Sequence, residues 1–374
     1  MSPARLPLFH FAQSYTDSDQ YYLTGFLCSD PFAVLELPGG RTIAAVSAME
    51  YGRAEKESKC DELDLLIRGK NKNDRPESAV VDFLKKRGAN HICVLPSFPV
   101  GLARYMENEG VYMEVDSKSV KERRRAKSAE EIGYIENVQR KTEGAMEMAR
   151  SFLAGCPVRK GVLQYEGSDL TAEKLRSLIE IFLLERGLDC VDSIVAPGRT
   201  AANPHNRGLG PIHAGVPIVI DLFPRDRITR YHSDMSRTFV VGPASCAVRD
   251  MHNTVVQAQD VALERLEPGV LLPDVHRAVC DVFQARGYRV PGAPGKVLKR
   301  GFLHSTGHGL GLDVHEAPSV SPEGDELRPG DVITIEPGLY DSRIGGVRIE
   351  DVVVVTAEGE VRNLTRFDRE LEIK

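Results

Sequence analysis

The run Ile218-Val-Ile-Asp221-Leu-Phe223 places a single aspartate among five apolar residues. Apolar runs of this length are typical of a strand that is buried on both faces. A buried carboxylate without a partner is costly, because the protein interior does not replace the water that solvates its charge. The run therefore indicates either a local pairing with a cation or amide at the strand end, or a functional site.

The same anomaly recurs in three further segments of the second half of the chain. They are His232-Ser-Asp234-Met-Ser-Arg-Thr-Phe-Val-Val241, Val332-Ile-Thr-Ile-Glu336 and Val347-Arg-Ile-Glu350-Asp-Val-Val-Val-Val355. A local partner explains one such acid, but four of them within one domain call for a shared positive partner. Divalent cations meet this need, since one ion offsets the desolvation of several carboxylates at once.

A glycine-rich segment, Gly301 to Glu316, adds three histidines: His304, His308 and His315. Glycines flank His308 on both sides and let the backbone bend tightly there. A lone histidine is more often a core or surface residue than a ligand. Three histidines, in a chain that also has four acids within apolar segments, indicate a functional site. The pair His315-Glu316 is followed by Ala-Pro, so it does not form the helical H-E-x-x-H zinc motif.

Length and composition limit the class of protein. The chain has 374 residues, which predicts two domains. Its net charge of −6 argues against a nucleic-acid partner. No apolar run reaches the roughly 18 residues of a membrane span, the N-terminus lacks a signal-peptide core, and the scattered cysteines contain no C-x-x-C pair. We therefore expect a cytoplasmic protein that does not enter a membrane.

The first third alternates strand and helix patterns, which predicts a small α/β domain over residues 1–124. Strand-forming residues from Tyr21 to Leu37, the turn Pro38-Gly39-Gly40 and the segment Arg41 to Val46 predict a hairpin. Further along, we expect helices over 78–87 and 103–109, and strands over 91–95 and 111–115.

A basic run from Lys118 to Lys127 ends this region. We interpret it as a solvated linker or as the ends of inter-domain salt bridges, because the run is short and the chain is acidic. Ser128 and Glu131 then have the spacing of a capping box, which predicts a long helix that ends near Leu153. The second domain is accordingly expected to cover residues 125–374.

The second domain also mixes helices with strands. Helical patterns that end at glycine or proline cover residues 171–186, 245–266 and 273–286. Strands are expected over 193–196, 217–223, 235–241, 332–335 and 347–356. The four acids of the apolar segments lie within or beside these strands.

The acids and one histidine, in the chain order Asp, Asp, His, Glu, Glu, resemble the ligand set of the pita-bread metallopeptidases. This family includes Xaa-Pro aminopeptidases, prolidases and methionine aminopeptidases. The matching residues are Asp221, Asp234, His308, Glu336 and Glu350. The resemblance covers the chain from about residue 125 to its end. It implies an α+β fold with a curved antiparallel sheet, covered by two pairs of helices, and with metals in its concave centre.

A weaker resemblance extends to the first domain. Tyr22-Leu-Thr-Gly-Phe-Leu-Cys-Ser-Asp30 and the segment Glu50 to Ala54 are similar to the N-terminal domain of the creatinase, prolidase and aminopeptidase P branch. Methionine aminopeptidases generally lack that domain, so the resemblance favours the branch that acts next to proline.

One departure from the family pattern concerns the second aspartate. The family usually places its two aspartates eleven residues apart, and that register falls on His232 here. Asp234 keeps the surrounding motif Tyr231-His-Ser-Asp234-Met-Ser-Arg-Thr-Phe. We interpret residues 224–231 as a hairpin lengthened by two residues, with Asp234 as the ligand and His232 as the alternative.

The resemblance implies two divalent cations. Asp234 and Glu350 would bridge both ions, Asp221 would complete one, and His308 and Glu336 would complete the other. One imidazole and four carboxylates make a hard, oxygen-rich site, which favours manganese or cobalt and also admits zinc.

The resemblance also assigns roles to residues around the metals. Glu336 would carry a proton, while His205 and His315 would hold the scissile amide and the developing oxyanion. His304 would shape the proline pocket or serve as a hydrogen-bonded wall residue. Arg348 would pair with the bridging acids, and Tyr231 is a further candidate that strand packing explains equally well.

These roles imply an exopeptidase that cleaves the bond before proline in peptides, either dipeptides (prolidase) or the N-terminus of longer peptides (aminopeptidase P). A homodimer is implied by the same resemblance. Two rivals stay open: a metal-free hydrolase of the creatinase type, and a non-catalytic pita-bread protein that binds peptides. Both types typically lack part of the ligand set that is complete here.

Overall fold

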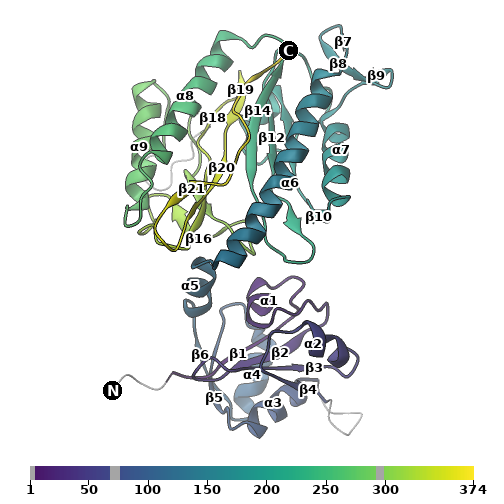
Figure 1. Cartoon of the computed structure of the whole chain (residues 1–374), viewed down its shortest axis with the longest axis vertical. Coiled ribbons are helices and arrows are strands. Elements are labelled where there is room, and N and C mark those ends of the chain that lie inside the picture. Colours follow the sequence, from purple (N-terminus) through teal and green to yellow (C-terminus); the bar gives the residue numbers. More distant parts are fainter. Residues whose placement is uncertain (1–4, 68–75, 292–298) are drawn as a thin grey trace. The chain divides into compact units, whose positions relative to one another are not determined.

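The computed structural model describes residues 5–67, 76–291 and 299–374, and the chain divides into two compact units, Met1–Arg124 and Arg125–Lys374 (Figure 1). Each unit has its own core, and the two are described separately below.

The first unit contains a six-stranded sheet with the order β4-β3-β2-β1-β5-β6. Its strands are β1 (Leu8–Ala12), β2 (Phe32–Glu36), β3 (Thr42–Val46), β4 (Glu62–Leu65), β5 (His91–Val94) and β6 (Tyr112–Val115). Its helices are α1 (Ser18–Thr24), α2 (Tyr51–Glu57), α3 (Pro76–Lys86) and α4 (Val100–Asn108), and α5 (Ser119–Arg125) reaches the boundary. The sheet is mixed, because β1-β2 and β2-β3 are antiparallel and the other pairs are parallel.

The predicted hairpin is present in β2 and β3, but its first strand begins later than the sequence pattern indicated. Tyr21 and Tyr22 lie in α1 instead. The Asp17 carboxylate accepts the Gln20 N–H at 2.8 Å and starts the helix, and Gly25, with φ 62°, ends it. These two end signals outweigh the strand preference of the tyrosines.

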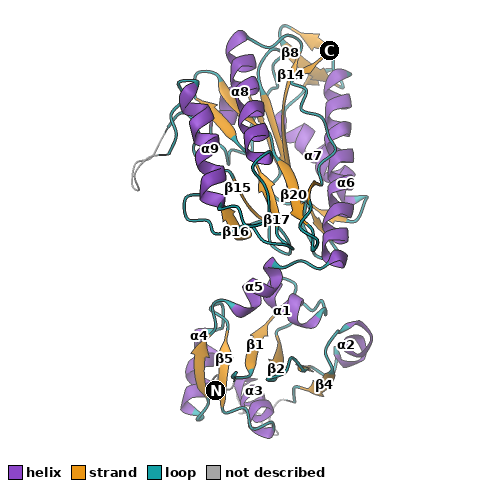
Figure 2. Ribbon diagram, turned by 60° about the vertical axis from the view of Figure 1, so that its left-hand side comes forward, coloured by secondary structure: helices purple, strands orange, loops and turns teal. Residues whose placement is uncertain are grey.

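The second unit has four long helices: α6 (Ala129–Ala154), α7 (Ala172–Leu184), α8 (Cys246–Leu263) and α9 (Leu272–Ala285). The capping box predicted from Ser128 and Glu131 is confirmed at the start of α6. Helices α6 and α7 pack together, as do α8 and α9, and Figure 2 shows the two pairs on opposite sides of the strands. A short 3-10 helix, Gly198–Ala202, precedes β12.

Two sheets form the centre of this unit. The first, in the order β11-β12-β14-β22, comprises β11 (Ile194–Pro197), β12 (Ile218–Leu222), β14 (Met235–Val241) and β22 (Glu372–Ile373). The second, in the order β16-β15-β17-β20-β21, comprises β15 (Gly307–Gly309), β16 (Glu316–Val320), β17 (Val332–Ile335), β20 (Asp351–Val355) and β21 (Val361–Asn363). Neighbouring strands are antiparallel except for the β14-β22 pair. The α+β expectation is thus confirmed.

Smaller ribbons complete the unit. They are β18 (Gly338–Asp341) with β19 (Gly345–Arg348), β10 (Leu188–Asp189) with β13 (Arg225–Asp226), and β7 (Val158–Arg159) with β8 (Val162–Tyr165) and β9 (Ser168–Asp169). One apolar core lies between the α6/α7 pair and the first sheet, and another lies between the α8/α9 pair and the second. Each helix pair therefore stabilises one sheet by burying its apolar face.

The strand predicted over residues 347–356 is interrupted. β19 ends at Arg348 and pairs with β18, whereas β20 begins at Asp351 and pairs with β17. Between them the Glu350 N–H donates to the Ser236 carbonyl, 3.1 Å away, on β14. The break arises because the backbone leaves the β18-β19 ribbon at this point and enters the second sheet at β20. An apolar run contains no local pattern that would predict such a change of partner.

The basic run also differs from its interpretation as a solvated linker. Arg125 and Lys127 are buried within the second unit. The Arg125 guanidinium binds Asp331 and Asp325, and the Lys127 ammonium binds Glu316. The run therefore supplies internal cations to the unit that follows it.

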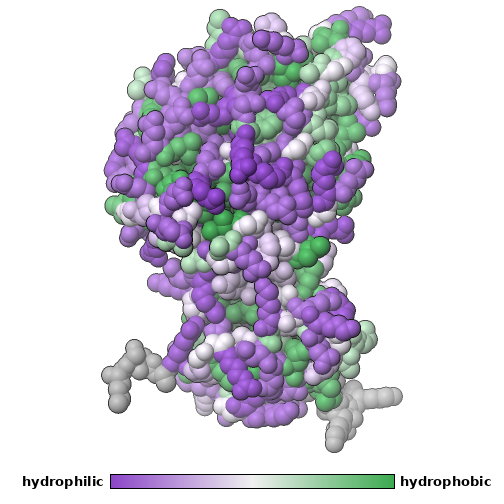
Figure 3. All heavy atoms as spheres, viewed as in Figure 1, coloured by the Kyte–Doolittle hydropathy of each residue, from purple (hydrophilic) through white to green (hydrophobic). Residues whose placement is uncertain are grey.

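Hydrophilic side chains cover most of the face shown in Figure 3, with smaller apolar areas between them. Within the part of the chain that the structure describes, no helix combines the length and the apolar character that crossing a membrane would need.

Candidate metal centre

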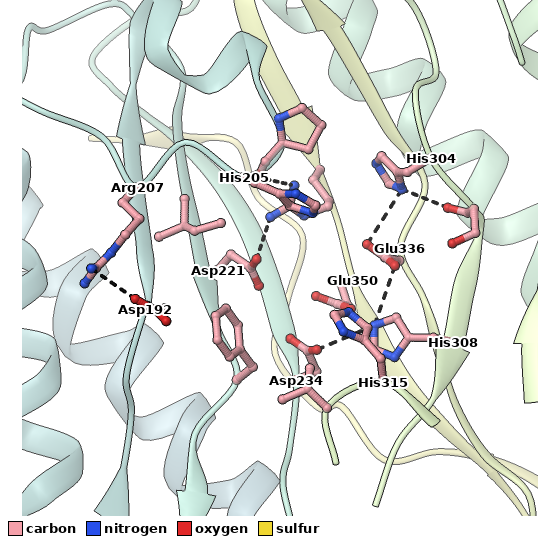
Figure 4. A pocket seen from close by; sticks show the side chains of 16 residues that line it. Asp192, His205, Arg207, Asp221, Asp234, His304, His308, His315, Glu336 and Glu350 are labelled. Atoms are coloured by element: carbon pink, nitrogen blue, oxygen red, sulfur yellow. Dashed lines mark hydrogen bonds and ion pairs between the residues drawn. The ribbon is translucent and has the colours of Figure 1, made fainter. Parts of the chain in front are cut away.

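A cavity of about 650 Å³ lies in the second unit. The side chains that line it include the predicted ligands Asp221, Asp234, His308, Glu336 and Glu350, together with His205, His304, His315 and Arg348 (Figure 4). Residues that are separated by up to 145 positions in the chain are thus brought to one place.

The first sheet positions the two aspartates. Asp221 lies near the end of β12, and Asp234 immediately precedes β14. Because Leu222 pairs with Met235 in the antiparallel register, Asp234 comes opposite the end of β12, close to Asp221. A bridge between Arg225 and His232 extends the hairpin beyond this point.

The second sheet positions His308. It lies in β15 between two glycines that pack directly against neighbouring backbone. A Cβ atom on Gly307 would lie 1.8 Å from the Thr334 carbonyl oxygen, and one on Gly309 would lie 2.3 Å from the Ala317 carbonyl oxygen. Only glycine fits at both positions, so the sequence sets the close packing of β15 and thereby the direction of the imidazole.

The donor atoms of the two sheets converge. His308 Nε2 lies 3.6 Å from Glu336 Oε1 and 3.8 Å from Asp234 Oδ2. One ligand atom each from Asp234, His308 and Glu350 lies within 4.8 Å of the others, a spacing that a shared cation can occupy. Asp221 Oδ1 and Asp234 Oδ1 are buried without a hydrogen-bond partner among the described residues. Buried acceptors without a donor are rare, so these atoms fit a site that is completed by metal ions.

The electrostatics of the acids point the same way. Burial raises the pKa of Asp234 well above its usual range, and repulsion by Glu350 and Asp221 raises it further. Burial also raises the pKa of Glu336, with repulsion by Glu350 as the next cause. Burial and the Asp221 charge raise the pKa of Glu350 to about 8. The chain's own cations therefore do not balance the cluster, and divalent ions would do so.

His308 is prepared to act as a ligand. Burial lowers its pKa to about 3, so the ring is neutral. Its Nδ1 lies 3.1 Å from the Gly309 carbonyl oxygen, which only accepts hydrogen bonds. Nδ1 therefore carries the proton, and the lone pair of Nε2 faces Asp234 and Glu336. A backbone acceptor that fixes the tautomer in this way is a common feature of metal-binding histidines.

Arg348 joins several of the acids. Its Nη2 lies 2.6 Å from Asp221 Oδ2, and its Nε lies 2.8 Å from the Ser236 hydroxyl oxygen. The Ser236 hydroxyl in turn donates to Glu350 Oε2 at 3.0 Å. One buried guanidinium thus contacts one acid directly and orients a second through a serine.

A hydrogen-bonded chain runs from Arg348 to His304 through Tyr340, a residue that no sequence pattern marks as functional. Arg348 Nη1 donates to the Tyr340 hydroxyl at 3.0 Å, and that hydroxyl lies 2.8 Å from His304 Nε2. His304 Nδ1 lies 2.8 Å from the Ser305 carbonyl oxygen, so Nδ1 carries the proton and Nε2 accepts from Tyr340. Burial lowers the pKa of His304 to about 3, which keeps the ring neutral.

His205 and His315 line the same cavity and are exposed to it. The His315 ring packs edge-on against His308, with ring centroids 4.3 Å apart. Burial also lowers the pKa of His315. Both imidazoles are therefore accessible to a molecule that enters the cavity.

Two residues considered from the sequence lie elsewhere. The Tyr231 hydroxyl donates to Glu131 at 2.5 Å, and the ring packs against Tyr134. His232 Nδ1 lies 3.2 Å from the Phe223 carbonyl oxygen. Neither belongs to the described residues that line the cavity.

The cavity also has a part that the sequence did not indicate. Ile194, Phe223 and Val314 form an apolar part of its wall. Arg207 also lines the cavity and pairs with Asp192 at 3.1 Å (Figure 4). Arg207 follows His205 by two positions, and that proximity is the one sequence signal that could have suggested it.

Comparison with known proteins connects this geometry to characterised chains. The sequence model of Metallopeptidase family M24 matches residues 133–357. An Xaa-Pro dipeptidase of Pyrococcus furiosus is 38% identical over 182 residues, which span 48% of this chain and 49% of that protein. An Xaa-Pro dipeptidase of Pyrococcus horikoshii is 30% identical over 358 residues, which cover 94% of this chain and 91% of that protein.

Solved structures extend the likeness to the fold. The prolidase of Pyrococcus horikoshii OT3 superposes with a TM-score of 0.80 at 27% sequence identity, covering 98% of this chain and 95% of that one. The pita-bread fold expected of the second unit is confirmed by this match.

Proposed function

Because this chain belongs to metallopeptidase family M24, we propose that it is a two-metal exopeptidase that cleaves the bond before proline. The observation that carries the proposal is the convergence of the neutral His308 imidazole and four buried or half-buried acids on a single cavity. Two of the carboxylate oxygens have no donor among the described residues. The relatives that are named Xaa-Pro dipeptidases support the choice of proline peptides as substrates.

In this proposal Asp234 and Glu350 would be shared by two divalent cations, Asp221 would help to hold one ion, and His308 and Glu336 would help to hold the other. When bound, such ions lower the pKa of water, so that a nucleophile is available at neutral pH. The oxygen-rich donor set favours manganese or cobalt over a thiolate-seeking metal, and zinc is the third choice.

The remaining residues act on the substrate. His205 and His315 both line the cavity. In this proposal they bind the scissile carbonyl and stabilise the oxyanion that develops from it. Glu336 delivers a proton to the proline nitrogen, which leaves as an amine. His304, held by Tyr340, forms a wall of the proline pocket. A dedicated pocket is needed, since the amide before proline has no N–H and carries a ring.

The proposal includes substrates of two lengths. Dipeptides are favoured by the names of the relatives, and removal of one residue from longer peptides is the second possibility. We further propose that the protein forms a homodimer, which the family resemblance supports and which light scattering of the purified protein tests. We also propose a cytoplasmic location.

The decisive experiment measures metal content and cleavage together. Purified protein is stripped with a chelator and reloaded with manganese, cobalt or zinc, and hydrolysis of Ala-Pro and Ala-Pro-Ala is then followed by amine release. We expect about two ions per chain and cleavage only after reloading. Binding of proline peptides without cleavage under any metal would instead support a binding protein, and cleavage by the stripped protein would support a metal-free hydrolase.

A further inference from the structure

The turn between β15 and β16, residues 310–315, carries two side chains of the cavity, Val314 and His315, and Glu316 follows it as the first residue of β16. The Gly311 N–H donates to the Asp313 carbonyl at 3.1 Å, and the Gly311 carbonyl accepts from the His232 N–H at 2.8 Å. These bonds fix one end of the turn. The end that follows His315 is fixed by a different contact.

That contact is the ion pair between Lys127 and Glu316. Lys127 Nζ lies 2.5 Å from Glu316 Oε1, and the two side chains are 1% and 10% exposed. The Lys127 backbone is itself anchored, because its N–H donates to the Gly330 carbonyl at 3.0 Å. Ser128, the next residue, caps α6. The ammonium therefore extends from a fixed backbone position to the residue directly after His315.

The packing around the ion pair leaves it little freedom. A Cβ atom on Gly311 would lie 2.3 Å from Glu316 Oε1 and 3.0 Å from Lys127 Cε. The second oxygen of Glu316 accepts the Asp313 N–H at 3.5 Å. One carboxylate thus connects the Lys127 ammonium to the backbone of the turn, in a space that is closed by Gly311.

We propose that Lys127 is a positioning residue: through Glu316, its charge holds the turn so that His315 faces the substrate. This rests on the role given to His315 under the proposed function. Lys127 lies at the end of the basic run and is distant from the proposed metal ligands in sequence. When one partner of a buried charge pair is removed, the other charge is left uncompensated. Without the Lys127 ammonium, the Glu316 carboxylate would therefore move toward water, and the turn would move with it.

The test compares three variants: Lys127→Met, the double variant Lys127→Met/Glu316→Met, and Arg125→Met. The last is the matched control, because Arg125 is a buried cation that pairs with Asp331 and Asp325 and not with the turn. Hydrogen exchange of peptides that cover residues 309–317 reports on the turn without any catalysis. Steady-state kinetics on Ala-Pro report on His315.

For Lys127→Met we expect faster exchange in the turn and a kcat that is about 10- to 100-fold lower, as found for residues that orient others at metal sites. KM should change little, because His315 acts mainly on the transition state. The double variant should regain thermal stability, since no unpaired charge is left, yet keep the low kcat and the fast exchange. Arg125→Met should lose stability with the exchange of the turn unchanged.

Two results would overturn the inference. One is a Lys127→Met variant with normal exchange in the turn. The other is a double variant whose kcat returns to that of the unaltered protein, which would show that the unpaired charge alone caused the loss. If the unaltered protein cleaves no proline peptide with any metal, the proposed function fails, whereas the exchange measurement still decides whether Lys127 holds the turn.

Discussion

Two groups of buried acids lie in the second unit, and they differ in what balances them. In one group, each acid has a cation from the chain: Asp331 binds Arg125, Glu316 binds Lys127, and Asp351 binds Arg237. In the other, four acids surround one cavity, and the described part of the chain contributes a single buried guanidinium to it, Arg348. The first group is balanced internally, whereas the second requires charge from outside the chain.

The adjacent residues Glu350 and Asp351 show the difference most directly. Successive side chains point to opposite faces of an extended backbone. Glu350 faces the cavity, where burial raises its pKa to about 8, while Asp351 binds Arg237 at 2.9 Å on the other face. Both are acids beside an apolar strand, so burial alone does not distinguish a structural acid from a metal ligand. The supply of cations does.

The largest effect that would test this comparison is expected for Asp234→Asn. Removing this ligand should lower kcat/KM at least about 1,000-fold, because residues that only orient ligands already account for 10- to 100-fold. Metal analysis should show fewer than two bound ions. The chelated variant should be no less stable than the chelated parent, since the substitution removes a charge that repels Glu350 and Asp221. A variant that is unfolded without metal would contradict this account.

The complementary substitution is Asp351→Asn, in the balanced group. It leaves the guanidinium of Arg237, which is 1% exposed, without its carboxylate. We expect the free energy of unfolding to fall by about 3 to 5 kcal/mol, as is usual when one partner of a buried pair is removed. Bound metal should be unchanged in the folded fraction. Chemical denaturation and metal analysis on the same sample measure the two effects separately. Loss of bound metal in this variant would show that the two groups of acids are not independent.

The sequence predicts most of the acids that surround the cavity, but it does not predict the acids that are balanced by cations of the chain. Asp221 and Glu336 are conspicuous because each is the lone acid in or beside an apolar strand, and Glu350, next to Asp351, adjoins a further apolar strand; this pattern is local. Their common position could not follow from local pattern, since it depends on how two sheets meet. The family resemblance supplied that step.

The partners of the balanced acids were not predictable in the same way. Arg125 and Lys127 lie in a run of basic residues that reads as solvated, yet they bind acids about 190 to 206 positions away. Tyr340 was equally inconspicuous, because a tyrosine in a strand usually packs and its hydroxyl partners are set by tertiary structure. The interruption of the last long strand at Glu350 depends likewise on a backbone contact with Ser236.

A smaller effect concerns pH. The raised pKa values of Asp234, Glu336 and Glu350 belong to the metal-free folded chain, and the unfolded acids titrate near 4. Stability from such acids is present at low pH and is lost as the pH rises toward the folded pKa, about 8 for Glu350. The chelated protein should therefore become progressively less stable than the metal-loaded protein as the pH rises from 5 to 8.

Thermal denaturation of both forms across that pH range measures the difference. A gap between the loaded and chelated forms that stays constant with pH would show that the acids are already balanced without metal. The Asp234→Asn variant provides the matched control, because its chelated form should depend less on pH than that of the parent.

The smallest effect is expected where burial is missing. Lys85 and Glu109, in the first unit, lie 3.4 Å apart and are 46% and 43% exposed. Water solvates both charges whether or not they meet, so Lys85→Gln should change the free energy of unfolding by less than about 0.5 kcal/mol. Added salt should reduce even this difference. Denaturation of Lys85→Gln beside Asp351→Asn therefore measures what burial contributes, and equal losses in the two variants would mean that the balance of buried charge does not distinguish the two groups of acids.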